Sequence, residues 1–286
     1  MIVPYRLLNR SVILVDTLPA MASRAEQKAA ARARREAQQR ASSVAQARRM
    51  RMIWLGGVVA AVALVIVVIV VAVGGGTKTL TIKQAEAKVT SLLRGIPQSG
   101  NTLGKASAPI TLTEYGDLVC PICQEFALTT EQNLISGPVR AGKVKIKYLA
   151  AETASGDANA GEFLSGQVAA LAAGNQHLAW NYILLWYYEQ QSEDTPYVNE
   201  AFIQRLAQHV PGLDLTKWQA DRGDQTLTNQ VKADLAAMEG LVKQKLVPEY
   251  ATPTLIFSDD KSGQSSAPFQ GVPTFGSMQT IIKELS

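Results

Sequence analysis

The spacing of apolar and polar residues divides the chain into three kinds of segment. Residues 52–76 form one uninterrupted apolar run without a charge. Residues 110–116 and 143–150 alternate apolar and polar positions and are rich in β-formers, which predicts two strands. Residues 155–246 instead place apolar residues at helical spacing and show no strand pattern. A long helical region is therefore expected between the first strands and the end of the chain.

The strand pattern returns near the C-terminus. The stretch TLIF at 254–257 predicts a third strand, and APFQGV at 267–272 predicts a short partner strand. Residues 276–286 close the chain with a helical pattern that places Ile281, Ile282 and Leu285 on one face.

Helical spacing also surrounds the first strand. Residues 123–135 predict a helix, so the order strand, helix, strand forms a βαβ unit. Residues 82–95 predict a short helix that leads into the folded part. Residues 96–109 between this helix and the first strand are expected to be a loop because of their composition.

The apolar run predicts a membrane anchor. Some twenty helical residues, at about 1.5 Å each, cross the hydrocarbon core of a bilayer, so residues 52–73 suffice. The run is longer than the apolar region of about 7–15 residues in a cleaved signal peptide, which favours a retained signal-anchor. Arginines crowd its N-terminal flank, so the positive-inside rule places the N-terminus in the cytoplasm and residues from about 77 onward outside. Disulfides persist in that compartment.

Charge is distributed unevenly along the chain. Residues 1–51 carry eleven Arg or Lys and three acids, a net charge of +8, whereas the whole chain is +4, which leaves −4 for residues 52–286. The basic tail lacks interleaved aromatic residues, so we expect no nucleic-acid partner. Met21 opens a stretch typical of a natural N-terminus, and we interpret residues 1–20 as carrying no function.

Both cysteines of the chain, Cys120 and Cys123, form a single C-x-x-C motif after the first predicted strand. This spacing serves half of a zinc site, a copper site, or a dithiol that cycles with a disulfide. Zinc usually takes four Cys or His ligands, and the chain adds only His177 and His209, which lie far apart. A Cu(I) site usually recruits a further Met or His, and none stands near the motif. We expect no metal or other cofactor, although a Cu(I) carrier and a structural disulfide stay open as alternatives.

The position of the motif suits thiol chemistry. The thiolate is the attacking species, and a helix N-terminus lowers the pKa of a cysteine. Cys120 lies where the predicted helix starts, and Pro121 suits its first turn. Cys123 lies one turn further on the same side, where it can close a disulfide with Cys120. We expect the first sulfur to be exposed and the second to be covered.

The segment APITLTEYGDLVCPICQEF resembles the active-site segment of DsbA-like thiol-disulfide oxidoreductases of the thioredoxin superfamily, and the resemblance covers roughly residues 98–286. It implies a thioredoxin fold with a helical domain inserted after the C-x-x-C half. It also implies a cis-proline loop opposite the dithiol, which YATPTLIF matches at Thr252 and Pro253. Pro273 is the alternative, but a helix rather than a strand follows it.

The family resemblance further implies a buried acid near the second cysteine. Glu114, six residues before Cys120, matches that position and is the candidate for exchanging a proton with Cys123. Two residues depart from the strongest oxidants of the family. Ile122 replaces the histidine between the cysteines, and Asp117 adds a negative charge that would raise the pKa of Cys120 if it lay close. On this interpretation only the helix terminus lowers that pKa.

The predicted fold is therefore α/β: a thioredoxin fold with an inserted helical domain, preceded by one transmembrane helix. The expected segments are a basic cytoplasmic tail (1–51), a transmembrane anchor (52–75), a linker with a short helix (76–108), the first thioredoxin half with C-x-x-C (109–154), the helical insertion (155–246) and the second half with the cis-proline loop (247–286).

The expected function is extracytoplasmic thiol-disulfide exchange that introduces disulfides into exported proteins. A reductase or isomerase of the same fold, a tethered Cu(I)-binding module and a chaperone are the alternatives. The expected partners are exported proteins with free cysteines, membrane lipid around residues 52–73 and, by resemblance, a quinone-linked membrane oxidase.

Overall fold

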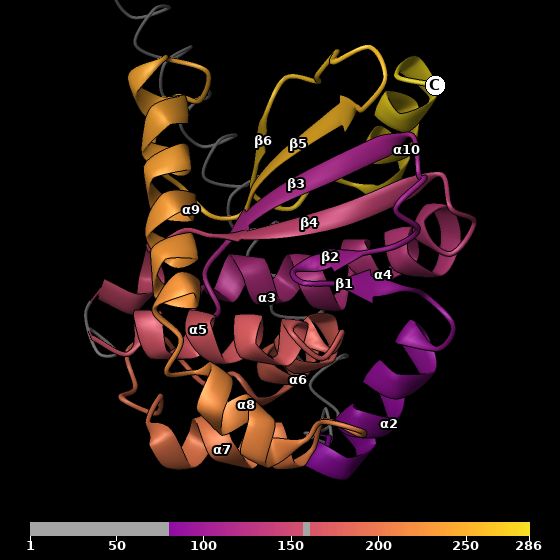
Figure 1. Ribbon diagram of the computed structural model, residues 1–286. Coiled ribbons are helices and arrows are strands. Elements are labelled where there is room, and N and C mark those ends of the chain that lie inside the picture. Colours follow the sequence, from indigo (N-terminus) through magenta and orange to yellow (C-terminus); the bar gives the residue numbers. More distant parts are fainter. Residues whose placement is uncertain (1–79, 157–160) are drawn as a thin grey trace, which may run out of the picture. The chain divides into compact units, whose positions relative to one another are not determined.

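The computed structural model of the protein describes residues 80–156 and 161–286, and a six-stranded sheet lies at its centre (Figure 1). The strand order is β1-β2-β4-β3-β5-β6. Strands β3 and β4 are parallel, and every other neighbouring pair is antiparallel. The strands are β1 (Gln98–Ser99), β2 (Thr102–Leu103), β3 (Ile110–Gly116), β4 (Val144–Ala150), β5 (Thr254–Asp259) and β6 (Phe269–Gln270).

Most of the helices follow β4, and α5 to α8 lie together on one side of the sheet (Figure 1). Helix α9, drawn in orange, contacts both α5 and β4. The α-helices are α2 (Ile82–Leu93), α3 (Pro121–Leu128), α4 (Thr130–Leu134), α5 (Phe163–Gly174), α6 (Ala179–Glu189), α7 (Glu200–Gln208), α8 (Leu215–Asp221), α9 (Gln225–Lys243) and α10 (Phe275–Glu284). A π-helix, η1 (Ile135–Val139), follows α4, and a 3-10 turn, η2 (Ala154–Gly156), follows β4.

The two faces of the sheet are buried in separate clusters because side chains alternate along each strand. Ile110 and Leu112 of β3 belong to the larger cluster, which includes residues of α3, α5, α6 and α10. Tyr115 of β3 and Leu149 of β4 belong to a smaller cluster with Met238 of α9. Glu114 has the same parity as Ile110 and Leu112, so its carboxyl group points into the larger core.

Three segments meet at one end of this sheet. Gly116 at the end of β3 is paired with Ala150 at the end of β4, so the chain leaves both parallel strands at the same end of the sheet. Tyr115 is paired with Thr254, the first residue of the antiparallel β5. The loop before Cys120, the segment after β4 and the segment before β5 therefore lie together.

The described elements agree with the predicted strands at 110–116, 143–150 and 254–257 and with the helical region after β4. The predicted helix at 123–135 is wrong in detail, because Thr129 leaves helical geometry and separates α3 from α4. The Thr129 hydroxyl donates to the Glu125 carbonyl at 2.5 Å, and such a bond to the preceding turn bends a helix.

The segment 96–109 was predicted to be a loop, and this prediction is also wrong. Residues 98–99 and 102–103 form the β1-β2 hairpin, and Leu103 of β2 pairs with Ile146 of β4. Sequence periodicity could not reveal strands of two residues each. The predicted basic tail and the anchor at 52–75 lie outside the described residues. Within 80–156 and 161–286, no helix combines the length and apolar character needed to cross a bilayer.

Candidate active site

Cys120 caps the N-terminus of α3. Its backbone is extended (φ −67°, ψ 123°), and the Cys123 amide N–H donates to its sulfur over 3.5 Å. Pro121 occupies the first turn, where its missing N–H leaves no helical hydrogen bond unmade. The unpaired N–H groups of the first turn therefore surround the position where a thiolate charge would develop.

A cis peptide bond joins Thr252 to Pro253 directly before β5, as the family resemblance implied. The Cys120 thiol donates to the Thr252 carbonyl oxygen over 3.6 Å, so this loop lies across the sulfur. Cys120 is only 5% exposed as a result, and the expectation of an openly exposed first sulfur is wrong. Cys123 is completely buried, so Cys120 still has the more accessible sulfur of the two.

The two cysteines differ in acidity. The pKa of Cys120 falls from 9.0 to about 6, chiefly because its sulfur is hydrogen-bonded to the Cys123 side chain, with smaller contributions from Thr252 and from backbone N–H groups. The helix terminus is therefore not the sole cause of the low pKa, contrary to the prediction. Burial raises the pKa of Cys123 well above its ordinary value, and the neighbouring Cys120 raises it further. In the reduced protein, the pKa difference favours a thiolate at Cys120 and a protonated thiol at Cys123.

The low pKa of Cys120 predicts a pH profile. We expect its alkylation by iodoacetamide to rise with pH to a plateau, with a midpoint near pH 6. The folded pKa lies below the unfolded one, so the thiolate stabilises the reduced fold progressively between pH 6 and about 9, and this stabilisation disappears below pH 6. Mass-spectrometric rates and urea unfolding of the reduced protein measure the two effects. A midpoint near 9 would contradict the assignment.

Glu114 lies beneath the dithiol and is 1% exposed. Burial raises its pKa from 4.5 to about 7, and its charge contributes to the raised pKa of Cys123. Glu131 of α4 is equally buried, and each of these two carboxyl groups affects the pKa of the other. Within the described ranges, none of their four carboxyl oxygens has a hydrogen-bond partner in the structure. Two carboxylates so close in a core cannot both ionise readily, so the pair retains a proton near neutral pH.

The prediction from sequence missed Glu131. A signal was present, because Cys123, Ala127 and Glu131 are spaced four residues apart and all three are buried. This spacing places an acid on the inward face of a helix. A continuous helix over 123–135, as predicted, would also place Glu131 on the buried face. The helical pattern alone was therefore sufficient to find Glu131.

Asp117 is also completely buried, three residues before Cys120. Its carboxylate accepts hydrogen bonds from the amides of Val119, Thr153 and Ser155 at 2.8–3.1 Å and from the Ser155 hydroxyl at 2.7 Å. The sequence interpretation treated Asp117 only as a charge near Cys120. In the structure it ties the loop before Cys120 to the segment after β4.

The two histidines lie apart from this site. His209 pairs with Glu86 of α2 at 3.0 Å, and His177 follows α5 with a positive φ of 61°. In the part of the chain that the structure describes, no three Cys, His, Asp or Glu side chains are grouped to hold a metal ion.

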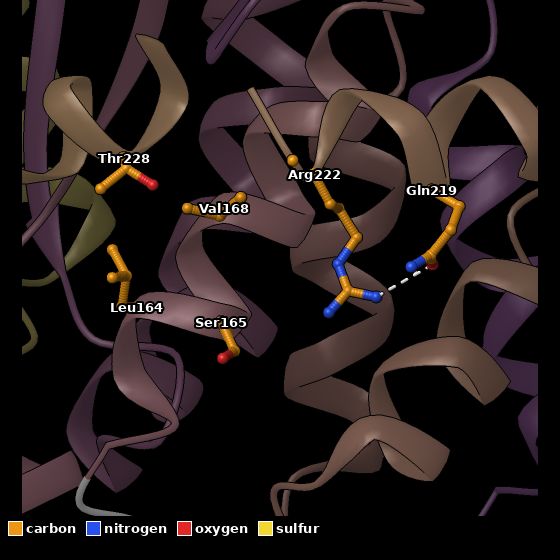
Figure 2. A pocket seen from close by; sticks show the side chains of 7 residues that line it. Leu164, Ser165, Val168, Gln219, Arg222 and Thr228 are labelled. Carbon is orange, nitrogen blue, oxygen red and sulfur yellow. Dashed lines mark hydrogen bonds between the residues drawn. The ribbon is translucent and has the colours of Figure 1, made fainter. Parts of the chain in front are cut away.

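A cavity of about 360 Å³ is lined by residues of α5, α8, α9 and the turn before α9, among them Leu164, Val168 and Arg222 (Figure 2). The Arg222 guanidinium donates to the Glu200 carboxylate at 2.6 and 2.7 Å and lies 4.8 Å from the centre of the Trp218 ring. Among the described residues of the lining, Arg222 is the only cationic group, and it is thus already paired. The lining includes no residue of the C-x-x-C or cis-proline segments, so we assign this cavity no role in the chemistry.

The family of the chain follows from comparison with known proteins. A family model described as Thioredoxin matches residues 98–283. The chain belongs to this thioredoxin family. The matched residues extend from β1 to α10 and include the C-x-x-C motif, the helices after β4 and the cis-proline loop.

Among curated proteins, the Bacillus anthracis "Probable disulfide bond formation protein D" is 22% identical over 134 residues, which are 46% of this thioredoxin-family chain and 60% of that relative. Oxidised BdbD from Bacillus subtilis superposes with a TM-score of 0.51 at 18% identity and covers 66% of this chain and 95% of that one. Wolbachia pipientis alpha-DsbA1 superposes with a TM-score of 0.51 at 15% identity and covers 68% and 92%. The structural matches confirm the expected fold, which this chain shares with BdbD and alpha-DsbA1.

Proposed function

We propose that this thioredoxin-family protein is a thiol-disulfide oxidoreductase that introduces disulfides into exported proteins. The observation that carries the proposal is the unequal cysteine pair: an acidic Cys120 at a helix N-terminus beneath the cis-proline loop, and a buried, weakly acidic Cys123. The names of the relatives, a probable disulfide bond formation protein and DsbA proteins, agree with it.

The reaction begins from the Cys120–Cys123 disulfide. A substrate thiolate attacks the Cys120 sulfur, a mixed disulfide forms, and Cys123 leaves as a thiolate that takes up a proton. A second substrate thiolate then attacks the substrate sulfur of the mixed disulfide, and Cys120 leaves as a thiolate. Two electrons pass from the substrate dithiol to the protein, and the substrate gains one disulfide. The low pKa of Cys120 favours the second step because it makes Cys120 a good leaving group.

Glu114 is the group proposed to supply the proton that Cys123 takes up. A carboxyl group with a pKa of about 7 holds a proton in roughly half of the molecules at neutral pH and releases it readily. The adjacent Glu131 lies in the same buried site, where burial and the charge of Glu114 raise its pKa as well. The protein would need no bound cofactor, because the cysteines themselves carry the electrons.

The surface around the nucleophile suits an unfolded polypeptide. Ile122, between the cysteines, is 42% exposed and offers an apolar contact beside Cys120. The proposed cellular arrangement is a single-pass anchor at residues 52–73, with the N-terminus in the cytoplasm and the thioredoxin domain outside. A quinone-linked membrane oxidase is the proposed acceptor of the electrons. Protease protection of the tail and of the domain in sealed cells tests the orientation.

The function is tested by two assays on the purified protein. The oxidised form should accelerate formation of native disulfides in a reduced substrate, and the reduced form should reduce insulin more slowly than a dedicated reductase does. A reduction potential near or above about −150 mV indicates an oxidant, and one near −270 mV indicates a reductant or isomerase. Absence of catalysis in both assays would overturn the proposal, and stoichiometric copper in the purified reduced protein would favour a Cu(I) carrier.

Replacing Glu114 by glutamine is expected to slow oxidation of the substrate by about ten- to a hundredfold near neutral pH, because Cys123 loses its proton donor. The raised pKa also fixes the sign for stability. Ionising Glu114 destabilises the fold as pH rises from 4.5 to 7, so the variant should gain stability relative to wild type above pH 7 and not below pH 4.5. Stopped-flow rates and urea unfolding at pH 4.5 and 8 measure both effects.

The matched control is Glu125→Gln, an exposed acid on the same helix as the cysteines. It should change neither the rate nor the pH dependence of stability. Equal behaviour of the two variants would argue against the role of Glu114.

A further inference from the structure

The nucleophile Cys120 belongs to a closed ring of hydrogen bonds, whose other members are Asp117, Thr153 and Thr252. The Asp117 carboxylate accepts from the Thr153 amide at 2.8 Å. The Thr153 and Thr252 hydroxyl oxygens lie 2.5 Å apart. The Thr252 carbonyl accepts from the Cys120 thiol over 3.6 Å, and the Cys120 amide donates to the Asp117 carbonyl at 3.1 Å. The three segments that meet at the end of the sheet are thus joined side by side.

We propose that Thr153 is a positioning residue of this site: anchored by Asp117, it directs the Thr252 hydroxyl toward the Cys120 sulfur. The inference rests on the proposed function and deepens it. It assigns a role in the redox chemistry to the segment after β4, which lies outside both the C-x-x-C motif and the cis-proline loop.

The direction of the hydrogen bonds follows from the charge on the sulfur. Either threonine can donate in the hydroxyl pair. A thiolate accepts hydrogen bonds only, so ionisation of Cys120 removes the bond from its thiol to the Thr252 carbonyl. In the proposed arrangement the Thr252 hydroxyl then donates to the sulfur and accepts from Thr153. The Thr252 side chain is among the groups that lower the pKa of Cys120. With Thr153 as its donor, the Thr252 hydroxyl is both oriented and polarised.

The anchoring explains why Thr153 holds its place although its side chain is exposed. Its amide and that of Ser155 both donate to one carboxylate oxygen of Asp117, and the Ser155 hydroxyl donates to the other. Asp117 and Ser155 are completely buried, so these bonds are shielded from water. A fixed backbone at 153 places the exposed hydroxyl against Thr252.

Through the Thr252 hydroxyl, Thr153 favours the thiolate of the reduced protein. In the disulfide form Cys120 carries no charge, so the Thr252 hydroxyl has no anion to stabilise. Removing the Thr153 hydroxyl should therefore weaken the thiolate and leave the disulfide nearly unaffected. The effect is limited because water can reach an exposed site and replace part of the lost hydrogen bond.

The test is Thr153→Val, which removes the hydroxyl at an exposed position and retains the shape. We expect the pKa of Cys120, followed by thiolate ultraviolet absorbance, to rise by about 0.5. The same loss should shift the equilibrium with glutathione about threefold toward the disulfide form. Thr153→Ser should behave like wild type, and so should Thr280→Val, which removes an exposed hydroxyl from α10.

The double variant distinguishes the relay from a general disturbance. In a Thr252→Val background, Thr153→Val should have no further effect on the pKa of Cys120, because Thr153 acts through Thr252. An unchanged pKa in Thr153→Val, an equal shift in Thr153→Ser, or a shift that persists in the Thr252→Val background would each overturn the inference. These readouts do not require turnover, so a wild-type protein without exchange activity would refute the proposed function separately.

Discussion

Cys120→Ser is expected to lose at least about a thousandfold in the rate of disulfide exchange with a reduced protein substrate. The hydroxyl of serine neither forms the disulfide that accepts the electrons nor ionises near neutral pH. The variant loses the low-pKa thiol of Cys120. Cys123 cannot replace it as the nucleophile, because Cys123 is completely buried and its pKa is raised. Refolding of a reduced substrate, followed by the appearance of its native activity, measures the loss.

Cys123→Ser is the matched variant, because it removes the other sulfur and leaves the nucleophile. It retains a reactive Cys120 but cannot resolve a mixed disulfide from within the protein. Its Cys120 thiolate can attack a substrate that already carries a disulfide, which forms a mixed disulfide and releases one substrate thiolate. We expect these covalent complexes to accumulate on non-reducing gels, whereas Cys120→Ser should accumulate none. Equal trapping by both variants would show that the two sulfurs are not differentiated in the way that their burial and pKa values indicate.

Asp117→Ala is expected to lower the free energy of unfolding by about 3 kcal/mol or more. The substitution leaves the amides of Val119, Thr153 and Ser155 without the carboxylate that now accepts from them. Each buried donor left unpaired costs on the order of 1 to 3 kcal/mol, and partial entry of water offsets some of the total. Urea unfolding of the reduced protein measures the loss.

The control for Asp117 is Asp214→Ala. Asp214 is exposed and caps α8 through one hydrogen bond from the Lys217 amide, so its loss should cost about 1 kcal/mol. Similar losses in the two variants would mean that Asp117 does not hold the segments around Cys120 together.

Local patterns were sufficient for β3, β4 and β5 and for the start of α3. Alternation in residues 110–116 predicted β3, and Pro121 after Cys120 predicted a helix beginning at the motif. The Thr252-Pro253 pair directly before TLIF predicted the cis peptide at Pro253 through family resemblance. The split of the helix at Thr129 and the β1-β2 hairpin were not predicted, because one hydroxyl and four strand residues leave little trace in periodicity.

The sequence by itself determined the dithiol and its place at a helix N-terminus, because these depend on neighbours within one or two turns of chain. The fold that surrounds the dithiol was implied by the family resemblance of the active-site segment. Only the tertiary structure decided what surrounds the sulfur. Asp117 and Thr153 are 36 residues apart, and Thr153 and Thr252 are 99 apart. Their contacts exist because β3, β4 and β5 align so that their connecting segments leave the sheet at one end, and that alignment is a property of the assembled sheet.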